Sequence, residues 1–209
     1  MNINKSIVFK RVLMFIIVFA MMFIGYGLQV FGYNDYGIKP RTFSFSTLYS
    51  LSMHWTMHSN CEHIRNNTLF LIQLMIPFII FEQQPIKRCI QLILIAGIFT
   101  WMFGSPNTNH VGASGLVFAL IGYILMTGII TLYCLFRNNH WHERVKGLVY
   151  FGLSVFAILE LKYLHSIWHG IFPESNNISI AGHLGGLIGG MLIAYYYKPK
   201  SKQQYPYIN

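Results

Sequence analysis

The residues of this chain best suited to chemistry are a serine and a histidine that lie far apart in the sequence. Ser114 sits in the small-residue turn Gly112-Ala113-Ser114-Gly115, directly before a long apolar segment, and His183 begins another. Serine and histidine are the minimum pair for nucleophilic acyl transfer, because the imidazole can take the hydroxyl proton. If both segments cross a membrane, the pair lies at a depth where polar residues are costly and are functional candidates by default.

Each of the two residues also has a simpler interpretation. Ser114 could be an ordinary N-cap, and His183 could be hydrogen-bonded to nearby backbone. The glycine spacing favours the functional interpretation. Gly186 and Gly190 share the helix face of His183, and Gly115 lies beside Ser114 on its own helix. Such smooth faces allow two helices to approach closely, which would bring the serine and the histidine together.

Further polar side chains gather at the start of a third apolar segment. His63 and Asn67 are four positions apart, so they project from one side of a helix. An imidazole and an amide can both donate hydrogen bonds to an oxyanion, which a serine attacking a carbonyl requires. Backbone N–H groups at the start of the Ser114 helix would add donors. His110, just before the Gly112 turn, is expected to hold that loop by hydrogen bonding.

Metal binding is the alternative interpretation of the histidines. His54 and His58 have the spacing of a zinc-binding helix, and His63 could be a third ligand. Trp55, however, occupies the position where an H-E-x-x-H motif has its glutamate, and that motif is absent from the chain. The three cysteines form no CxxC pair, which indicates neither a disulfide framework nor a thiolate site. We therefore expect no metal and no other cofactor.

The composition is typical of a membrane protein. Of the 209 residues, 54% are hydrophobic and only 10% are charged, with a mean hydropathy of +0.47. Soluble domains carry about a quarter charged residues. The net charge of +9 would suit nucleic acid, but the basic residues are scattered in short gaps between apolar segments, so no nucleic-acid partner is expected. The chain is predicted to be an all-α, polytopic protein of the lipid bilayer.

Six apolar segments are predicted to form transmembrane helices, since a spanning helix needs about twenty residues. Two of them, 89–103 and 147–161, are short unless flanking residues join them. The chain is thus expected to hold a single integral-membrane domain over residues 1–200 and a short polar tail over 201–209. The predicted segments are Val12–Tyr33, His63–Phe81, Cys89–Phe103, Ser114–Phe136, Gly147–Leu161 and His183–Tyr197.

The distribution of basic residues predicts the orientation. Eleven of the fifteen lysines and arginines would lie on one side of the membrane, the side that carries both termini. The positive-inside rule therefore puts both termini in the cytoplasm and the loop Asn34–Glu62 outside. That loop mixes aromatic and polar residues, so it could lie in the membrane interface rather than in water.

Together these motifs resemble the rhomboid family of intramembrane serine proteases, in its bacterial six-helix form. Three motifs match in order along nearly the whole chain: an H-x4-H-x3-N pattern at the second helix, a G-x-S-G nucleophile loop, and a histidine helix with glycines three and seven positions after the base. The matching residues are His58, His63, Asn67, Gly112, Ser114, Gly115, His183, Gly186 and Gly190.

The resemblance implies a role for each of these residues. Ser114 would be the nucleophile and His183 its general base. Asn67 and His63, with the backbone N–H of Ser114, would form the oxyanion hole. Phe118 stands where the family often has a tyrosine, so its ring would stack on the histidine without a hydroxyl group. Structural support would come from His58, Gly112, Gly115, Phe118, Gly186 and Gly190.

The implied function is that of a serine endopeptidase in a bacterial inner or plasma membrane. It would cleave transmembrane or membrane-anchored proteins near the outer face. Two alternatives remain: a catalytically inactive rhomboid-like protein that binds membrane clients, and a transporter whose histidines carry metal ions or protons. An inactive protein would not need Ser114, His183 and Asn67 together, and a transporter would tolerate Ser114→Ala.

Overall fold

The described part of the chain is helical, as predicted. The computed structural model describes residues 5–33, 37–135, 145, 147–152, 155 and 180–197. Apart from one isolated β-bridge, between Ile38 and His110, all regular structure in these residues is helix. The elements are α1 (Lys5–Val30), α2 (Phe45–Met53), the 3₁₀ helix η1 (His54–Thr56), α3 (Cys61–Phe81), α4 (Pro85–Phe103), α5 (Ser114–Leu135) and α8 (Ile180–Tyr196).

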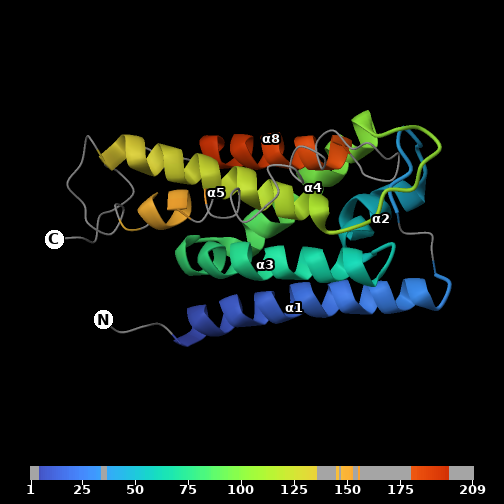
Figure 1. The fold of residues 1–209 in the computed structure, drawn as a ribbon, viewed down its shortest axis with the longest axis horizontal. Coiled ribbons are helices and arrows are strands. Elements are labelled where there is room, and N and C mark those ends of the chain that lie inside the picture. The colour runs from blue at the N-terminus through green and yellow to red at the C-terminus, as the bar shows by residue number, and fades with distance from the viewer. Residues whose placement is uncertain are drawn as a thin grey trace.

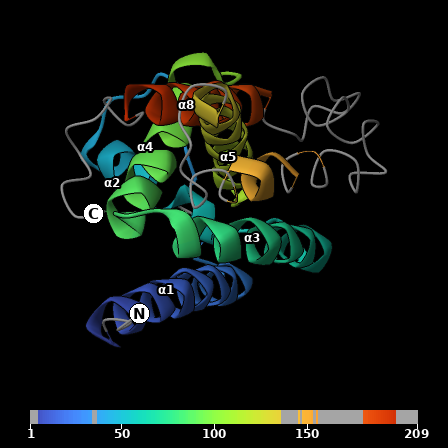
Figure 2. The same ribbon diagram turned by 90° about the vertical axis from the view of Figure 1, so that its left-hand side faces the viewer.

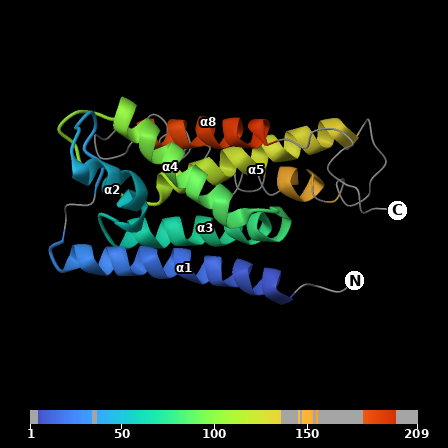
Figure 3. The ribbon, with the colours of Figure 1, turned by 180° about the vertical axis from the view of Figure 1, so that it is seen from behind.

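The long helices are arranged in two layers (Figures 1 and 2). Helices α1 and α3 lie side by side in one layer, and α5 and α8 pack together in the other, where α4 also contacts α8. Short helix α2 lies at one end of this bundle, where it contacts α4 (Figure 3). We call this the α2 end. The opposite end, which holds the start of α1 and the connection from α3 to α4, is the α3–α4 end.

Within the described residues, four helices are long and apolar enough to cross a membrane, as expected of an integral membrane protein. These spans are Val8–Val30, Cys61–Phe81, Pro85–Phe103 and Ser114–Tyr133, and α8 is a shorter apolar helix of 17 residues. Of the six predicted segments, the structure therefore supplies four spans and this shorter helix. Most of segment 147–161 and all of the tail 201–209 lie outside the described residues.

Two of the differences from the predicted elements have clear physical reasons. Helix α4 begins at Pro85 rather than Cys89, because proline at the first helical position loses no hydrogen bond and its fixed φ suits a helix. This extension gives α4 a spanning length. The predicted loop Asn34–Glu62 contains helix α2, whose N-cap Ser44 forms a capping box with Thr47.

The α3–α4 end contains a buried polar cluster that the sequence did not predict. Arg88, expected among the cytoplasmic charges, is only 7% exposed. Its Nε lies 3.8 Å from the Glu82 carboxylate, which also accepts a hydrogen bond from the Tyr123 hydroxyl. The Arg88 guanidinium also lies 3.3 Å above the centre of the Tyr197 ring. This cluster connects α4 to α5 and to the end of α8.

Candidate active site

Ser114 is the first residue of α5 and is half-buried. Two positions earlier, Gly112 has a φ of +121°, which a residue with a side chain rarely adopts. The first helical hydrogen bond of α5 runs from the Val117 N–H to the Ala113 carbonyl, at 2.9 Å. The N–H groups of Ser114 and Gly115 therefore point out of the helix start, where they can serve an acceptor outside the helix.

The backbones of α5 and α8 touch along a row of glycines. A Cβ atom on Gly186 would lie 2.4 Å from the carbonyl oxygen of Gly115, and one on Gly190 would lie 2.0 Å from that of Ala119. Neither position has room for a side chain. At the top of this contact, the carbonyl oxygen of Gly182 lies 3.6 Å from the Cβ position of Gly115. Since Gly182 precedes His183, the start of the histidine helix lies next to the serine turn.

A ring stack fixes the position of His183 over α5. The imidazole is 7% exposed and stacks on Phe118, with the ring centroids 4.4 Å apart and the planes 11° from parallel. This is the stack that the family resemblance implied. Because Phe118 follows Ser114 by four residues, both side chains are on one face of α5. The imidazole therefore lies against the residue of α5 that is one turn after Ser114.

His63 lies against the turn that precedes Ser114. A Cβ atom on Gly112 would lie 2.6 Å from Cε1 and 2.8 Å from Nε2 of the His63 ring. The other ring nitrogen, Nδ1, is 3.1 Å from the Ser59 hydroxyl oxygen. The main chain is held as well, because the Asn60 side chain caps α3 by accepting from the His63 N–H at 2.8 Å. The first turn of α3 is thereby fixed next to the serine turn.

Asn67 lies one turn further along α3, which packs against α5. Its side chain is buried, at 6% exposure, yet its Nδ2 atom has no hydrogen-bond partner within the described residues. Buried polar groups without a partner are uncommon in folded proteins and ask for an explanation. An unused donor close to a serine turn is what an anion-binding site requires.

Two histidines that precede α3 hold the serine turn through its backbone. The His54 carbonyl accepts from the Gly112 N–H at 3.0 Å, and the His58 Nε2 accepts from the Ala113 N–H at 3.3 Å. Burial lowers the pKa of His58 to about 3, helped by the nearby His63, and burial lowers the pKa of His54 to about 4. Both rings are therefore neutral near pH 7, so that His58 can act as an acceptor.

The zinc-helix interpretation of these histidines does not fit this geometry. His54 belongs to a 3₁₀ helix and His58 to the extended chain after it, so the pair does not share an α-helical face. The His54 Nδ1 is 3.2 Å from the Ser50 carbonyl oxygen. Among the residues that the structure describes, no three His, Cys, Asp or Glu side chains are grouped to hold a metal ion.

The segment before α2 is attached to the serine loop by contacts that sequence reasoning largely missed. Ile38 and His110 exchange two backbone hydrogen bonds of 2.9 Å. The Arg41 N–H donates to the Trp101 carbonyl at 3.0 Å, and the Trp101 indole donates to the Thr42 carbonyl at 2.9 Å. The predicted loop-holding role of His110 is confirmed. For Arg41 and Trp101 the sequence carried no signal, because their main contacts are to backbone atoms.

Two comparisons with known proteins point to the same family. The model of the Rhomboid domain family matches residues 46–200, well over half of the chain. An uncharacterised protein of Mycobacterium tuberculosis is 28% identical over 145 residues, which cover 66% of this chain and 55% of the relative. An uncharacterised protein of Mycobacterium leprae is 26% identical over 167 residues, covering 74% and 58%. A Bacillus subtilis protein named as a candidate rhomboid protease is 30% identical over 113 residues, covering 54% and 47%. The chain spans about half the length of these curated relatives.

Proposed function

Because this chain belongs to the rhomboid family, we propose that it is an intramembrane serine endopeptidase, with Ser114 as nucleophile and His183 as general base. One observation carries the proposal: the buried His183 ring stacks on Phe118, one turn after Ser114. The close approach of Gly182 to Gly115 supports it, since these glycines are the sequence neighbours of the two proposed catalytic residues.

The proposed reaction is hydrolysis of a peptide bond in two steps. The Ser114 oxygen attacks the carbonyl carbon while His183 takes the hydroxyl proton. When the C–N bond breaks, His183 donates that proton to the departing amine and an acyl-enzyme remains. A water molecule then attacks the acyl carbon, His183 accepts its proton, and the new carboxylic acid leaves as Ser114 regains its hydrogen.

The negative charge on the carbonyl oxygen needs hydrogen-bond donors. We assign this role to the Asn67 Nδ2, the His63 Nε2 and the backbone N–H of Ser114. The unpartnered, buried Nδ2 of Asn67 supports its assignment. For His63, a Ser59 hydroxyl that donates to Nδ1 leaves the ring proton on Nε2, the nitrogen that faces the Gly112 turn. One such donor contributes about 10²–10³ to kcat in serine proteases.

The proposed substrates are transmembrane or membrane-anchored proteins, cut near the outer membrane face. A helical substrate hides its carbonyl groups in its own hydrogen bonds, so it must unwind before Ser114 can attack. The proposed site lies at the α2 end, where the side chains of Phe43 and Phe45 are 87% and 90% exposed. Such aromatic side chains suit the membrane interface, where an unwound segment would enter. We place the protein in a bacterial plasma membrane with both termini in the cytoplasm.

A fluorophosphonate probe tests the proposed dyad directly. The full chain is purified in detergent and in lipid vesicles, and covalent labelling is measured. Wild type and the matched control Ser105→Ala, an exposed loop serine, are expected to label. Ser114→Ala should not label, and His183→Ala should label at least a hundredfold more slowly, because the base is lost.

Two results would contradict the proposal. Labelling that persists in Ser114→Ala would place the nucleophile elsewhere. A folded wild type that does not label in either environment would favour a client-binding protein without activity. If wild type does label, the substrates can be identified as ectodomains that are shed from cells with wild type but not from cells with Ser114→Ala.

A further inference from the structure

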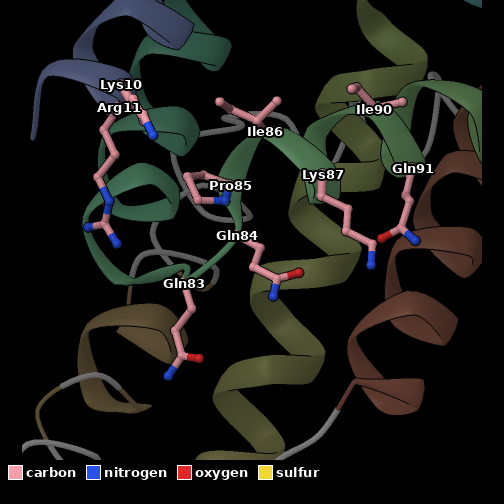
Figure 4. Close-up of a pocket in the computed structure, with 9 residues that line it drawn as sticks. All are labelled: Lys10, Arg11, Gln83, Gln84, Pro85, Ile86, Lys87, Ile90 and Gln91. Carbon is pink, nitrogen blue, oxygen red and sulfur yellow. The ribbon is translucent and has the colours of Figure 1, made fainter. Parts of the chain in front are cut away.

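An open cavity of about 830 Å³ lies at the α3–α4 end, far from the serine turn (Figure 4). Helix α1 contributes Lys10 and Arg11 to it, and the first two turns of α4 contribute Ile86, Lys87 and Ile90. Gln83 and Gln84 of the α3–α4 connection and Pro85 and Gln91 of α4 complete the lining. The cavity therefore lies between α1 and α4 and is lined by basic, amide and apolar side chains.

The cavity carries positive charge that nothing in its lining compensates. Lys10, Arg11 and Lys87 are the charged residues of the lining, and among the described residues the lining includes no carboxylate. The acidic residue Glu82, at the end of α3, directs its carboxylate to Tyr123 and Arg88 inside the protein. Cationic side chains gathered around an open cavity attract an anion.

Arg11 fixes one of these charges in place. Its Nη1 donates to the Ile80 carbonyl at 2.6 Å and its Nη2 to the Glu82 carbonyl at 2.9 Å. Carbonyl groups at a helix C-terminus lack intrahelical partners, so Arg11 satisfies the end of α3 while keeping its full charge. Its Nε atom has no partner within the described residues. The guanidinium therefore forms a rigid positive wall of the cavity.

The cavity also has an apolar side. Ile86 and Ile90 are 47% and 52% exposed and lie four residues apart on one face of α4. Figure 4 shows both side chains on one side of the helix, with Gln84 and Lys87 pointing to the other. On a membrane-spanning helix, exposed isoleucines face acyl chains. Cations around the start of such a helix suit a ligand with a negative head and an apolar tail.

We propose that this cavity binds an anionic phospholipid, with its phosphate between Lys10 and Lys87 and an acyl chain along Ile86 and Ile90. The positive end of the α4 dipole adds to the attraction, because α4 begins in the cavity and its N-cap Gln84 makes no side-chain cap. Basic clusters at a membrane surface select anionic lipids in this way. The lipid would hold α1, which lies outside the family match at residues 46–200, against α4. This inference does not depend on the proposed proteolysis.

Native mass spectrometry of the detergent-purified full chain tests the site. The probes are phosphatidylglycerol and phosphatidylcholine, added at equal concentration. The variant K10Q/K87Q is compared with K39Q/R65Q, which removes the same charge from exposed residues near the α2 end. Each lysine at a membrane surface contributes about fivefold to affinity for anionic lipid. K10Q/K87Q should therefore retain phosphatidylglycerol more than tenfold less than wild type, whereas K39Q/R65Q should match wild type.

Further measurements distinguish a bound phospholipid from a small bound anion. Ile90→Asn keeps all three cations and should still lower phosphatidylglycerol retention, because the tail contact is weakened. Equal retention of the two lipids, or equal losses in the two double variants, would overturn the site. Displacement of phosphatidylglycerol by an equal concentration of glycerol 3-phosphate would show a simple anion site and overturn the lipid assignment. Circular dichroism of each variant confirms that the helices are intact.

Discussion

Gly112 and Ala113 donate their N–H groups to His54 and His58, so the turn before Ser114 is held through its main chain by a distant segment. Only a neutral imidazole can accept from Ala113 at Nε2, because a protonated ring carries hydrogen on both nitrogens. The position of the serine turn therefore depends on the charge state of a histidine that the proposed reaction does not use.

This dependence predicts a loss of stability in mild acid. Because burial lowers the pKa values of His58 and His54 to about 3 and about 4, the unfolded chain binds more protons below pH 6.5. Stability should be complete above that pH and decline towards pH 4, by about 1.4 kcal/mol per pH unit for each ring. Thermal unfolding of the full chain between pH 8 and pH 4 measures this.

The matched variant for the pH effect is His58→Gln. It removes one titrating ring and keeps an amide oxygen that can accept from Ala113. Its unfolding midpoint should change less with pH than that of wild type. A wild-type midpoint that is the same at pH 7 and pH 5 would contradict the assigned charge states.

Asn67→Ala should separate catalysis from folding. The substitution removes a buried donor without a partner, so stability should hold or rise, while kcat for a membrane-embedded reporter peptide should fall by about 10²–10³. The neighbouring Asn66 is exposed and serves as control, with Asn66→Ala expected to behave like wild type. Unfolding midpoints and initial rates are measured on the same samples. An unchanged rate in Asn67→Ala would remove the amide from the proposed oxyanion hole.

Sequence reasoning found the side chains of the candidate site but not the contacts that hold them. The spacing of His63 and Asn67 was readable, because helix periodicity places residues on faces. The Phe118 stack was implied by the family resemblance. The role of His54 in holding the Gly112 turn could not be predicted, since His54 acts through its carbonyl oxygen, which every residue possesses. Its i, i+4 relation to His58 even suggested a zinc helix, which the 3₁₀ turn at His54–Thr56 excludes.

At the scale of elements, the α5–α8 contact should tolerate no added atoms. Gly186→Ala and Gly190→Ala each put a methyl group against a carbonyl oxygen of α5, at 2.4 and 2.0 Å before relaxation. Such overpacking costs about 1–3 kcal/mol or more, so both variants should unfold at lower temperature and lose activity. Gly27→Ala is the control, because a methyl group there has nothing within 4 Å and alanine favours a helix. A Gly190→Ala variant as stable as Gly27→Ala would contradict the packing.

The helices themselves were largely predictable, and the exceptions are instructive. Long apolar segments fixed α1, α3 and α5, because a membrane span carries a strong compositional signal. Helix α2 was missed because its nine residues mix Ser, Thr, Tyr and Leu without a clear apolar face. The start of α4 was misplaced because charged residues after Pro85 looked like a loop, although Arg88 is buried.

At the scale of the whole molecule, the two ends of the bundle differ in chemistry. The serine turn, His63 and α2 lie at one end, and the cavity with Lys10 and Lys87 lies at the other. At the α3–α4 end, Glu82 also pairs with Tyr123 and Arg88. This pairing could not have been predicted, because a single sequence does not show which residues of different helices meet. The positive charge bias does predict which end faces the cytoplasm.

Cysteine labelling tests this orientation. Cys61 is exposed at the start of α3, so a membrane-impermeant maleimide should modify it in intact spheroplasts. Gln83→Cys, placed in a Cys61→Ser background, is exposed at the opposite end and should react only after the membrane is opened. Mass spectrometry of the modified chain gives the readout. The reverse pattern would invert the topology and put the proposed active site on the cytoplasmic side.

The glycine row of α8 also limits how this protein can evolve. At Gly190 an added methyl group meets main-chain atoms of Ala119 and Tyr123. Every residue has these atoms, so no second substitution can remove the clash. At the adjacent Gly189 the obstacle is the branched side chain of Ile95, with Cγ1 at 2.6 Å and Cγ2 at 2.9 Å. Ile95→Ala deletes both atoms and should rescue Gly189→Ala. Two consecutive glycines therefore differ in which substitutions they can accept. Gly189 can be replaced when Ile95 on α4 changes with it. Gly190 cannot be replaced for as long as α5 and α8 remain in contact.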